Sequence, residues 1–418
     1  MSKEQRANAS RNPDHRPPVR AMKAALGLVL FLATGAHAGP PSVKITISLS
    51  DSARPVQPGP PGSTLRPELD VDPVLSIEEL AANFRPEQEQ ILADLIASTP
   101  DAEVEEKSNY YFLLGQLHAK LNRHWRLKSV ELAIRADQSK NAKTRAEAAA
   151  AAEKAKQYLQ KTVKTYKSLT DNEAFRNYPK LDTALFFYGY TLQSNQLMRE
   201  ARQIFHKLLK NHPQSKYVPE VYLVFADYFF EKGELANAES LYKNVLKFPK
   251  SAVYWYAMYK MGWIHLDQQR FQEALETFFQ VAQSTKHDKK QQGLNRASLK
   301  DFVRAFAEIG KTDKAYVAFQ RVDGQHALAM LQQLADLYLE QGKSDRASYV
   351  YQELMKTAPA DPNVCLWQYN LARATAYHAG KAQVVEVCAQ DVGPLKAWAR
   401  SNGVTVSCAS CAQDTKLP

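Results

Sequence analysis

The sequence predicts an all-α protein, a right-handed α-solenoid of antiparallel helix pairs that is preceded by a disordered linker. Turn-forming residues are too sparse for an all-β fold, because the 418 residues include only 16 glycines and no proline lies between Pro100 and Pro179. A β-sandwich or barrel needs a turn about every 8–12 residues. In addition, alanines followed by aromatic residues recur at a near-constant interval, which is typical of one elongated array of helix pairs.

The composition is that of a folded protein with a modest excess of positive charge. The chain is 45% hydrophobic and 23% charged, which is enough to bury a core. Its formal net charge is +10, but residues 1–38 hold six basic and only two acidic side chains. The other basic residues alternate with acids, whereas nucleic-acid binders concentrate Lys and Arg on one stripe. We therefore expect no nucleic-acid partner.

The first 38 residues have the parts of a secretory signal peptide. Lys23 precedes an apolar run, residues 24–36, and Ala36-His37-Ala38 fits a cleavage site. The run is shorter than the roughly 20 apolar residues that cross a bilayer, so we expect no transmembrane segment in the mature chain. A buried N-terminal helix is the alternative. The long polar stretch before Met22 suggests that translation starts at Met22, and the signal predicts an exported, periplasmic protein, peripheral to the outer membrane.

Two segments are expected between the signal and the repeats. Residues 39–75 are rich in proline and serine and are predicted to form a flexible linker. Within them Lys44–Leu49 alternates in polarity, which alone is a weak strand signal. Residues 76–178 are predicted to form N-terminal helices, and the alanine-rich stretch at 142–169 predicts an oversized helical hairpin there.

Five later units share one pattern, which we call the alanine–ring register. Each unit has an alanine, an aromatic residue four positions later and, mostly, a small residue twelve positions before the alanine. The alanines are Ala201, Ala238, Ala274, Ala315 and Ala347, at spacings of 32–41 residues. The aromatic residues are Phe205, Tyr242, Phe278, Phe319 and Tyr351, and the earlier positions are Gly189, Ala226, Gly262, Val303 and Ala335. Small residues allow close helix contact, so the register predicts helix pairs.

With this register the chain resembles tetratricopeptide-repeat (TPR) proteins over residues 107–380, since the spacings scatter about the ~34-residue period of that family. The resemblance implies a repeat array over residues 179–362. Residues 363–418 are expected to form C-terminal capping helices and a cysteine-bearing tail, because the ends of a solenoid need an atypical cap.

The resemblance also implies a concave groove lined by the first helix of each pair, where protein partners would bind. The groove candidates are Phe186, Tyr190, Asp227, Phe230, Tyr256, Tyr259, Trp263, Lys300 and Arg304. We assign Tyr254 and Trp255 to the core and expect Tyr256, Tyr259 and Trp263 to hold apolar side chains of a partner. Pure packing of these three rings is the alternative.

The sequence shows no arrangement of catalytic, cofactor-binding or metal-binding residues. Gly310-Lys311-Thr312 and Gly342-Lys343-Ser344 imitate the end of a phosphate-binding loop, but the glycine required five residues earlier is Ala305 or Leu337. Both triplets precede a register alanine and are predicted to be turns. The sequence therefore predicts a protein that is not an enzyme and binds no cofactor.

The four cysteines, Cys365, Cys388, Cys408 and Cys411, all lie near the C-terminal end of the sequence. In an exported protein they indicate disulfides, with three possible pairings. Cys408 and Cys411 also have the spacing of a thiol redox motif. A thiol–disulfide oxidoreductase is therefore the alternative function of another class.

One block, residues 179–278, resembles exported TPR proteins of myxobacteria and their relatives, a group that includes periplasmic components of the gliding-motility machinery. This resemblance implies a non-enzymatic scaffold or adaptor that binds protein subunits of an envelope complex. An outer-membrane assembly or secretion-associated TPR protein is the alternative within the same class.

Overall fold

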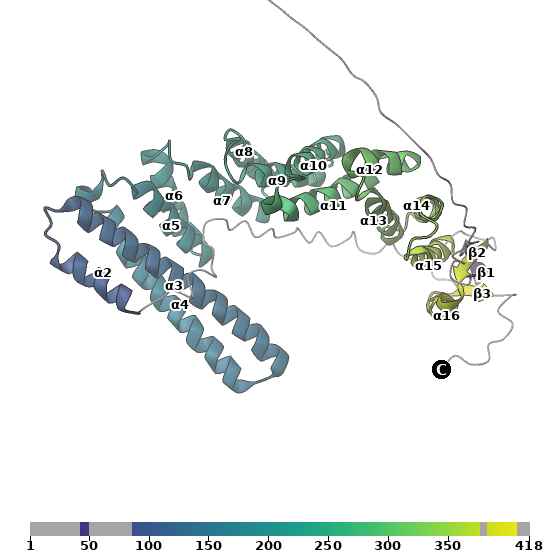
Figure 1. Cartoon of the computed structure of the whole chain (residues 1–418), viewed down its shortest axis with the longest axis horizontal. Helices are drawn as coiled ribbons and strands as arrows, with labels where there is room; N and C mark the ends of the chain where they lie inside the picture. Colours follow the sequence, from purple (N-terminus) through teal and green to yellow (C-terminus); the bar gives the residue numbers. More distant parts are fainter. Residues whose placement is uncertain (1–41, 50–85, 377–382, 408–418) are drawn as a thin grey trace, which may run out of the picture. The chain divides into compact units, whose positions relative to one another are not determined.

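A computed structural model describes residues 42–49, 86–376 and 383–407 (Figure 1). Several predicted features lie outside the described residues: the signal peptide, the translation start at Met22, the first helix expected at Ser76, and Cys408 and Cys411. The α-helices are α2 (Pro86–Ser98), α3 (Val104–Ser139), α4 (Ala142–Thr170), α5 (Leu181–Ser194), α6 (Met198–Asn211), α7 (Val218–Glu231), α8 (Leu235–Val245), α9 (Tyr254–Asp267), α10 (Phe271–Thr285), α11 (Gln292–Ile309), α12 (Ala315–Asp323), α13 (Ala327–Glu340), α14 (Ser344–Thr357), α15 (Val364–Thr375) and α16 (Val392–Ser401). The short 3₁₀ helices are η1 (Glu173–Phe175), η2 (Lys289–Gln291), η3 (Thr312–Lys314) and η4 (Ala389–Asp391), and the strands are β1 (Ser42–Leu49), β2 (Gln383–Cys388) and β3 (Val404–Ser407). The predicted solenoid of helix pairs is confirmed.

The alanine–ring register fixes how the two helices of each pair approach. All five register alanines and all five aromatic residues are fully buried. The ring of the second helix lies on the small residue of the first helix: a Cβ added to Gly262 would lie 2.6 Å from Cε1 of Phe278, and one added to Gly189 would lie 2.5 Å from the ring of Phe205. Only a residue without a side chain fits this approach, so both glycines are required by packing.

The first hairpin, α3 and α4, follows the same rule on longer helices. A Cβ on Gly115 of α3 would lie 2.6 Å from the ring of Tyr166, which is fully buried on α4. The Asn122 side chain donates to the carbonyl oxygen of Ala155 at 2.8 Å. Ala155 is one of several buried alanines on α4, so part of the alanine-rich stretch is a close-packed helix face.

A half-buried carboxylate ties α2 to this hairpin. Glu89 accepts hydrogen bonds from Lys161 at 2.5 Å and from Tyr158 at 3.3 Å, and it lies 3.2 Å from Nε2 of His118. Burial acts to raise the pKa of Glu89, but Lys161 and His118 outweigh it and hold the pKa below its ordinary value of 4.5. The ionised carboxylate is therefore the form that holds α2 in place.

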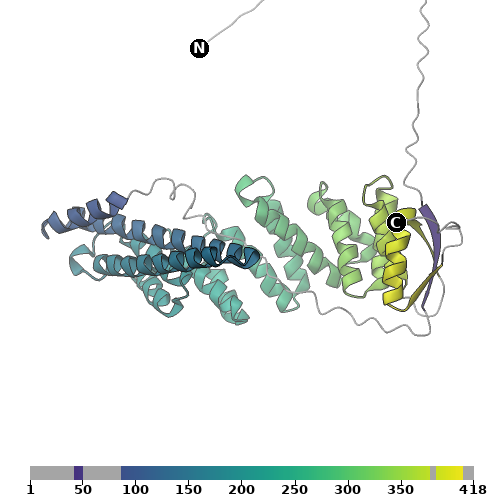
Figure 2. The ribbon, with the colours of Figure 1, turned by 90° about the horizontal axis from the view of Figure 1, so that it is seen from below.

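The C-terminal end differs from the expected all-helical cap. The helix α16 is present, but it lies beside a three-stranded antiparallel sheet in the order β2-β1-β3 (Figure 2). The central strand, β1, comes from the segment predicted as linker, and it pairs Val43 with Val387 and Leu49 with Val404. Its alternating pattern buries Ile45 and Ile47 in the same core as β2 and α16. The linker prediction is wrong for residues 42–49, because partners more than 330 residues away complete the sheet.

A disulfide joins this sheet to the last helix of the array. Cys365 at the start of α15 bonds to Cys388 at the end of β2, with Cα atoms 5.4 Å apart. In the sheet register Cys388 lies opposite Ser42, the first residue of β1. The disulfide therefore links the last repeat covalently to the strand that pairs with β1.

The hydrophobic core divides at α7. Val218 and Val221, near the start of α7, pack with the cluster of α3–α6, whereas Ala226 and Phe230, toward its end, pack with the cluster that continues to the sheet. Tyr222 is partly buried against both clusters. The two clusters of buried residues thus meet along α7, between α6 and α8.

The glycine contact leads to a first prediction. Gly262→Ala forces a methyl group against the buried ring of Phe278, and we expect it to lower the free energy of unfolding by about 1–3 kcal/mol. Gly393→Ala is the matched control, because a Cβ on Gly393 of α16 meets nothing within 4 Å. Denaturant unfolding followed by circular dichroism measures both variants, and equal stability of the two would contradict the packing rule.

The Glu89 contact predicts a pH dependence. Because the pKa of Glu89 is lowered in the folded chain, its stabilisation is full above pH 4.5 and disappears as the pH falls through the lowered value. The protection of the α2 amides against hydrogen exchange, relative to the intrinsic exchange rate at the same pH, should fall in that acid range. Glu89→Gln should give fast exchange already at neutral pH, whereas the exposed Glu87→Gln should behave as the parent chain; equal α2 exchange in both variants would refute the contact.

Candidate partner-binding site

The aromatic residues predicted to line the groove are core residues. Tyr259 is fully buried, Trp263 is 2% exposed and Tyr256 is 7% exposed. Tyr254 and Trp255, which the sequence assigned to the core, are only half-buried. Neither set therefore has the exposure that the sequence predicted. Tyr259 donates to Asp301 of α11, and Trp263 lies beside Arg304 of the same helix.

Two further groove candidates are also buried, and their rings pack within the first cluster or against α8. Phe186 is 3% exposed and stacks on Tyr217 with ring centroids 4.4 Å apart. Tyr190 is half-buried and stacks on Phe186 at 6.1 Å. Phe230 is 1% exposed and meets the ring of Tyr242 edge-on. All three rings therefore pack against other rings of the chain.

Asp227 is part of a contact network inside the protein. The Tyr242 hydroxyl of α8 donates to the Asp227 carboxylate, and Nζ of Lys260 on α9 lies 3.8 Å from it. The same ammonium lies 4.7 Å from the ring centroid of Phe230 and 5.4 Å from that of Tyr256. Burial raises the pKa of Asp227, against the opposing effects of Lys260 and Tyr242. This network joins three consecutive helices.

A second network joins α9 to α11. The Tyr259 hydroxyl donates to Asp301 at 2.6 Å, and the Arg304 guanidinium lies 3.5 Å from the same carboxylate. Arg304 also lies 5.0 Å from the ring centroid of Trp263. Burial raises the pKa of Asp301, while Tyr259 and Arg304 act to lower it. Of the nine predicted groove residues, Lys300 is exposed and the other eight are buried or half-buried. The nine therefore do not form one open groove.

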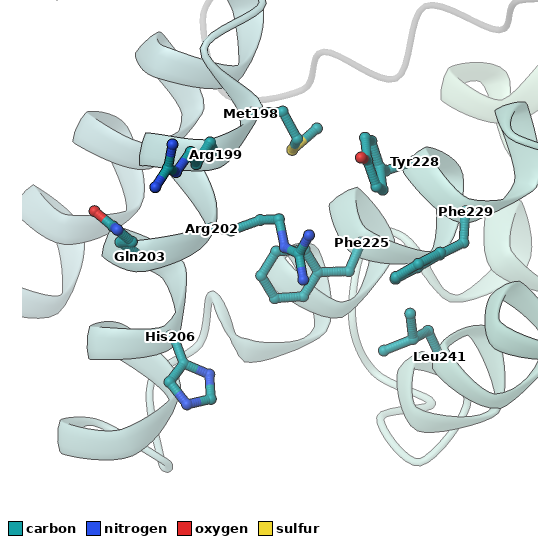
Figure 3. Close-up of a pocket in the computed structure, with 9 residues that line it drawn as sticks. All are labelled: Met198, Arg199, Arg202, Gln203, His206, Phe225, Tyr228, Phe229 and Leu241. Atoms are coloured by element: carbon teal, nitrogen blue, oxygen red, sulfur yellow. The ribbon is translucent and has the colours of Figure 1, made fainter.

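The structure has an open cleft elsewhere, between α6 and α8 and above α7, which we call the α6–α8 cleft (Figure 3). Its volume is about 620 Å³. It is lined by Met198, Arg199, Arg202, Gln203 and His206 of α6, Phe225, Tyr228 and Phe229 of α7, and Leu241 of α8. The cleft lies at the junction where the hydrophobic core divides.

The α6 wall of the cleft follows from the amphipathic pattern of that helix. Ala201, Phe205 and Leu208 are fully buried against α5, so the opposite side faces outward. Arg199, Arg202 and His206 share that side, because residues three, four and seven positions apart lie on one face of a helix. All three are exposed.

The α7 floor is aromatic and half-buried. Phe225 meets the buried ring of Phe205 edge-on at 5.9 Å, and Tyr228 and Phe229 pack edge to face at 5.4 Å. Figure 3 shows Arg202 reaching from α6 toward these rings, and its guanidinium carbon lies 6.0 Å from the centroid of Tyr228. Nζ of Lys232 lies 4.6 Å from the same ring. The floor thus carries apolar surface beneath a cationic rim.

The charge of the cleft has one sign. Of the described residues that line it, two are arginine and one is histidine, and none is acidic. A segment with carboxylates and large apolar side chains fits both parts of this surface. The sequence signal for this cleft is the spacing of Phe225, Tyr228 and Phe229, which places these three rings outside the helix face that contains Ala226. The predicted groove used only residues on the opposite face of α7.

The glycine–lysine triplets and the pair of Cys365 and Cys388, which resemble chemical sites, are parts of the fold itself. Gly310 follows the end of α11 and Gly342 has a φ of +69°, so both glycine–lysine pairs lie in the connection between two helices. Cys365, Cys388 and Asp391 come within 4.8 Å of one another, but the two sulfurs are bonded together and neither is a thiolate that could bind a metal. Among the described helices, none is both long and apolar enough to cross a membrane.

Comparisons with known proteins agree with this architecture. Residues 161–325 match a family model described as a tetratricopeptide repeat-like domain, and residues 329–361 match a tetratricopeptide repeat model. No curated protein is significantly similar to the chain in sequence.

Several solved structures are similar at low identity. A tetratricopeptide repeat protein from Parabacteroides merdae is 16% identical, covering 53% of this chain and 82% of its own, with a TM-score of 0.34. The type IV pilus biogenesis factor PilW is 15% identical, covering 53% and 94%, with a TM-score of 0.32. The pilF protein of Pseudomonas aeruginosa is 14% identical, covering 53% and 90%, with a TM-score of 0.31. The family-model matches coincide with the alanine–ring register, and residues 161–325 and 329–361 of this chain are therefore built of tetratricopeptide repeats.

Proposed function

We propose that the chain is an exported scaffold protein that binds a partner protein in the α6–α8 cleft and thereby joins subunits of an envelope complex. Helical repeats present extended surfaces and are used for protein–protein contacts in many settings. The signal-like residues 1–38 support export to the periplasm. The resemblance of residues 179–278 to exported myxobacterial proteins makes the gliding-motility machinery the candidate complex.

The observation that carries this proposal is the cleft itself. Elsewhere on α7 and α9 the groove candidates bond to neighbouring helices, as Asp227 does to Tyr242 and Tyr259 does to Asp301. In the cleft, aromatic side chains are instead half-buried beneath exposed arginines. Aromatic and arginine residues are the types that contribute most to protein interfaces.

The test is recovery of partners from cells. Phe229→Ala removes the central ring of the floor, and we expect it to reduce the partners recovered after crosslinking of the envelope fraction by tenfold or more, equivalent to at least about 1.4 kcal/mol of binding free energy. Helical content should not change, because Phe229 is only partly buried.

Phe279→Ala is the matched control, since Phe279 lies on α10 and is 39% exposed. It should leave recovery unchanged. If Phe229→Ala recovers the same partners in the same amounts as the parent chain, the α6–α8 cleft is not the binding site. If the partners come from the cytosolic fraction alone, the envelope scaffold is wrong.

A further inference from the structure

The two ends of residues 50–85 are attached to different ends of the helix series. β1 ends at Leu49 in the sheet, whose strand β2 packs on α15, the last helix of the repeats. α2 begins at Pro86 and packs on α3, in the first hairpin. Residues 50–85 therefore connect the last unit to the first, and at full extension they can span about 120 Å.

The second half of this connection has an unusual composition. Residues 67–84, which lie outside the described residues, read PELDVDPVLSIEELAANF. The acidic side chains are Glu68, Asp70, Asp72, Glu78 and Glu79, and the stretch has no lysine or arginine. Between the acids lie large apolar residues, among them Leu75, Ile77, Leu80 and Phe84. The stretch thus combines carboxylates with apolar side chains, the chemistry that fits the cleft.

We propose that residues 67–84 of this chain bind in the α6–α8 cleft and that an envelope partner competes with them for it. The carboxylates meet Arg199, Arg202 and Lys232, and the apolar side chains lie on Phe229 and Leu241. The inference rests on the proposed function, because both assume that the α6–α8 cleft binds a protein segment.

Two physical arguments favour this occupant over a free peptide of the same chemistry. Covalent attachment at both ends keeps the segment at a high effective concentration, of millimolar order for a flexible connection, so even a weak contact is filled. The cleft offers cations that no described acidic side chain of its lining neutralises, and the segment supplies only negative charge.

The experiment places a photo-crosslinking phenylalanine analogue at position 229 of the purified full-length chain. After illumination and digestion, mass analysis should find the crosslink within residues 67–84, in a product with the mass of one chain. The same analogue at Phe279, which is exposed on α10, is the control and should give no crosslink to this segment.

A charge reversal sharpens the test. Arg202→Glu should lower the yield of that crosslink at least about fivefold, and added Glu78→Lys and Glu79→Lys substitutions should restore it. Arg346→Glu is the matched control, because Arg346 is exposed and lies over the ring of Tyr338 as Arg202 lies over Tyr228. It should have no effect on the yield.

Three outcomes would overturn the inference: no crosslink from position 229, a crosslink to another part of the chain, or a product with the mass of two chains. These outcomes are separate from the test of the proposed function. If Phe229→Ala abolishes partner recovery while position 229 does not crosslink to residues 67–84, the cleft binds partners and only the internal occupant is wrong.

Discussion

The whole structure depends on one repeated contact, a buried aromatic ring of the second helix lying on a small residue of the first. Tyr166 lies on Gly115, Phe205 on Gly189 and Phe278 on Gly262, each at a distance that leaves no room for a Cβ atom. This contact sets the spacing of the two helices in a pair and so the face that each pair presents to the next. Interiors packed at this density transmit small changes, which is why a single methyl group is expected to matter.

Where the ring of the second helix belongs to Tyr242 or Tyr351, its hydroxyl group makes a further contact with the first helix. Tyr242 and Tyr351 of the second helices donate to Asp227 and Asp336 of the first helices, fifteen residues earlier in each case. Tyr259 donates to Asp301 of the next repeat. Because buried hydroxyl and carboxylate groups need partners, the first two pairs hold the two helices of a repeat together, and the third joins successive repeats across the face where a groove was expected. The α6–α8 cleft remains open at the division of the core.

The repeat architecture could be predicted because its signal is local. Ala274 and Phe278 stand four residues apart on one helix, and Gly262 lies in the helix that pairs with it, so a single stretch of sequence contains the whole contact. The burial of Tyr259 could not be predicted in this way, since it depends on Asp301, 42 residues later. For β1 the separation is greater still, because Val43 pairs with Val387 and the alternating pattern of eight residues does not reveal its partner. Periodicity identifies an apolar face but not the helix that covers it.

Hydroxyl-radical footprinting of the folded full-length chain tests the central claim most directly, namely that the rings expected to line a first-helix groove are buried instead. The account predicts that Phe279 and Tyr349, each 39% exposed, are oxidised many times faster than Tyr259 and Trp263, which are 0% and 2% exposed. Denatured protein, in which all four rings react, provides the reference rates. If Tyr259 and Trp263 are instead the fast-reacting pair, the partner surface lies in the first-helix groove and the account given for the cleft is wrong.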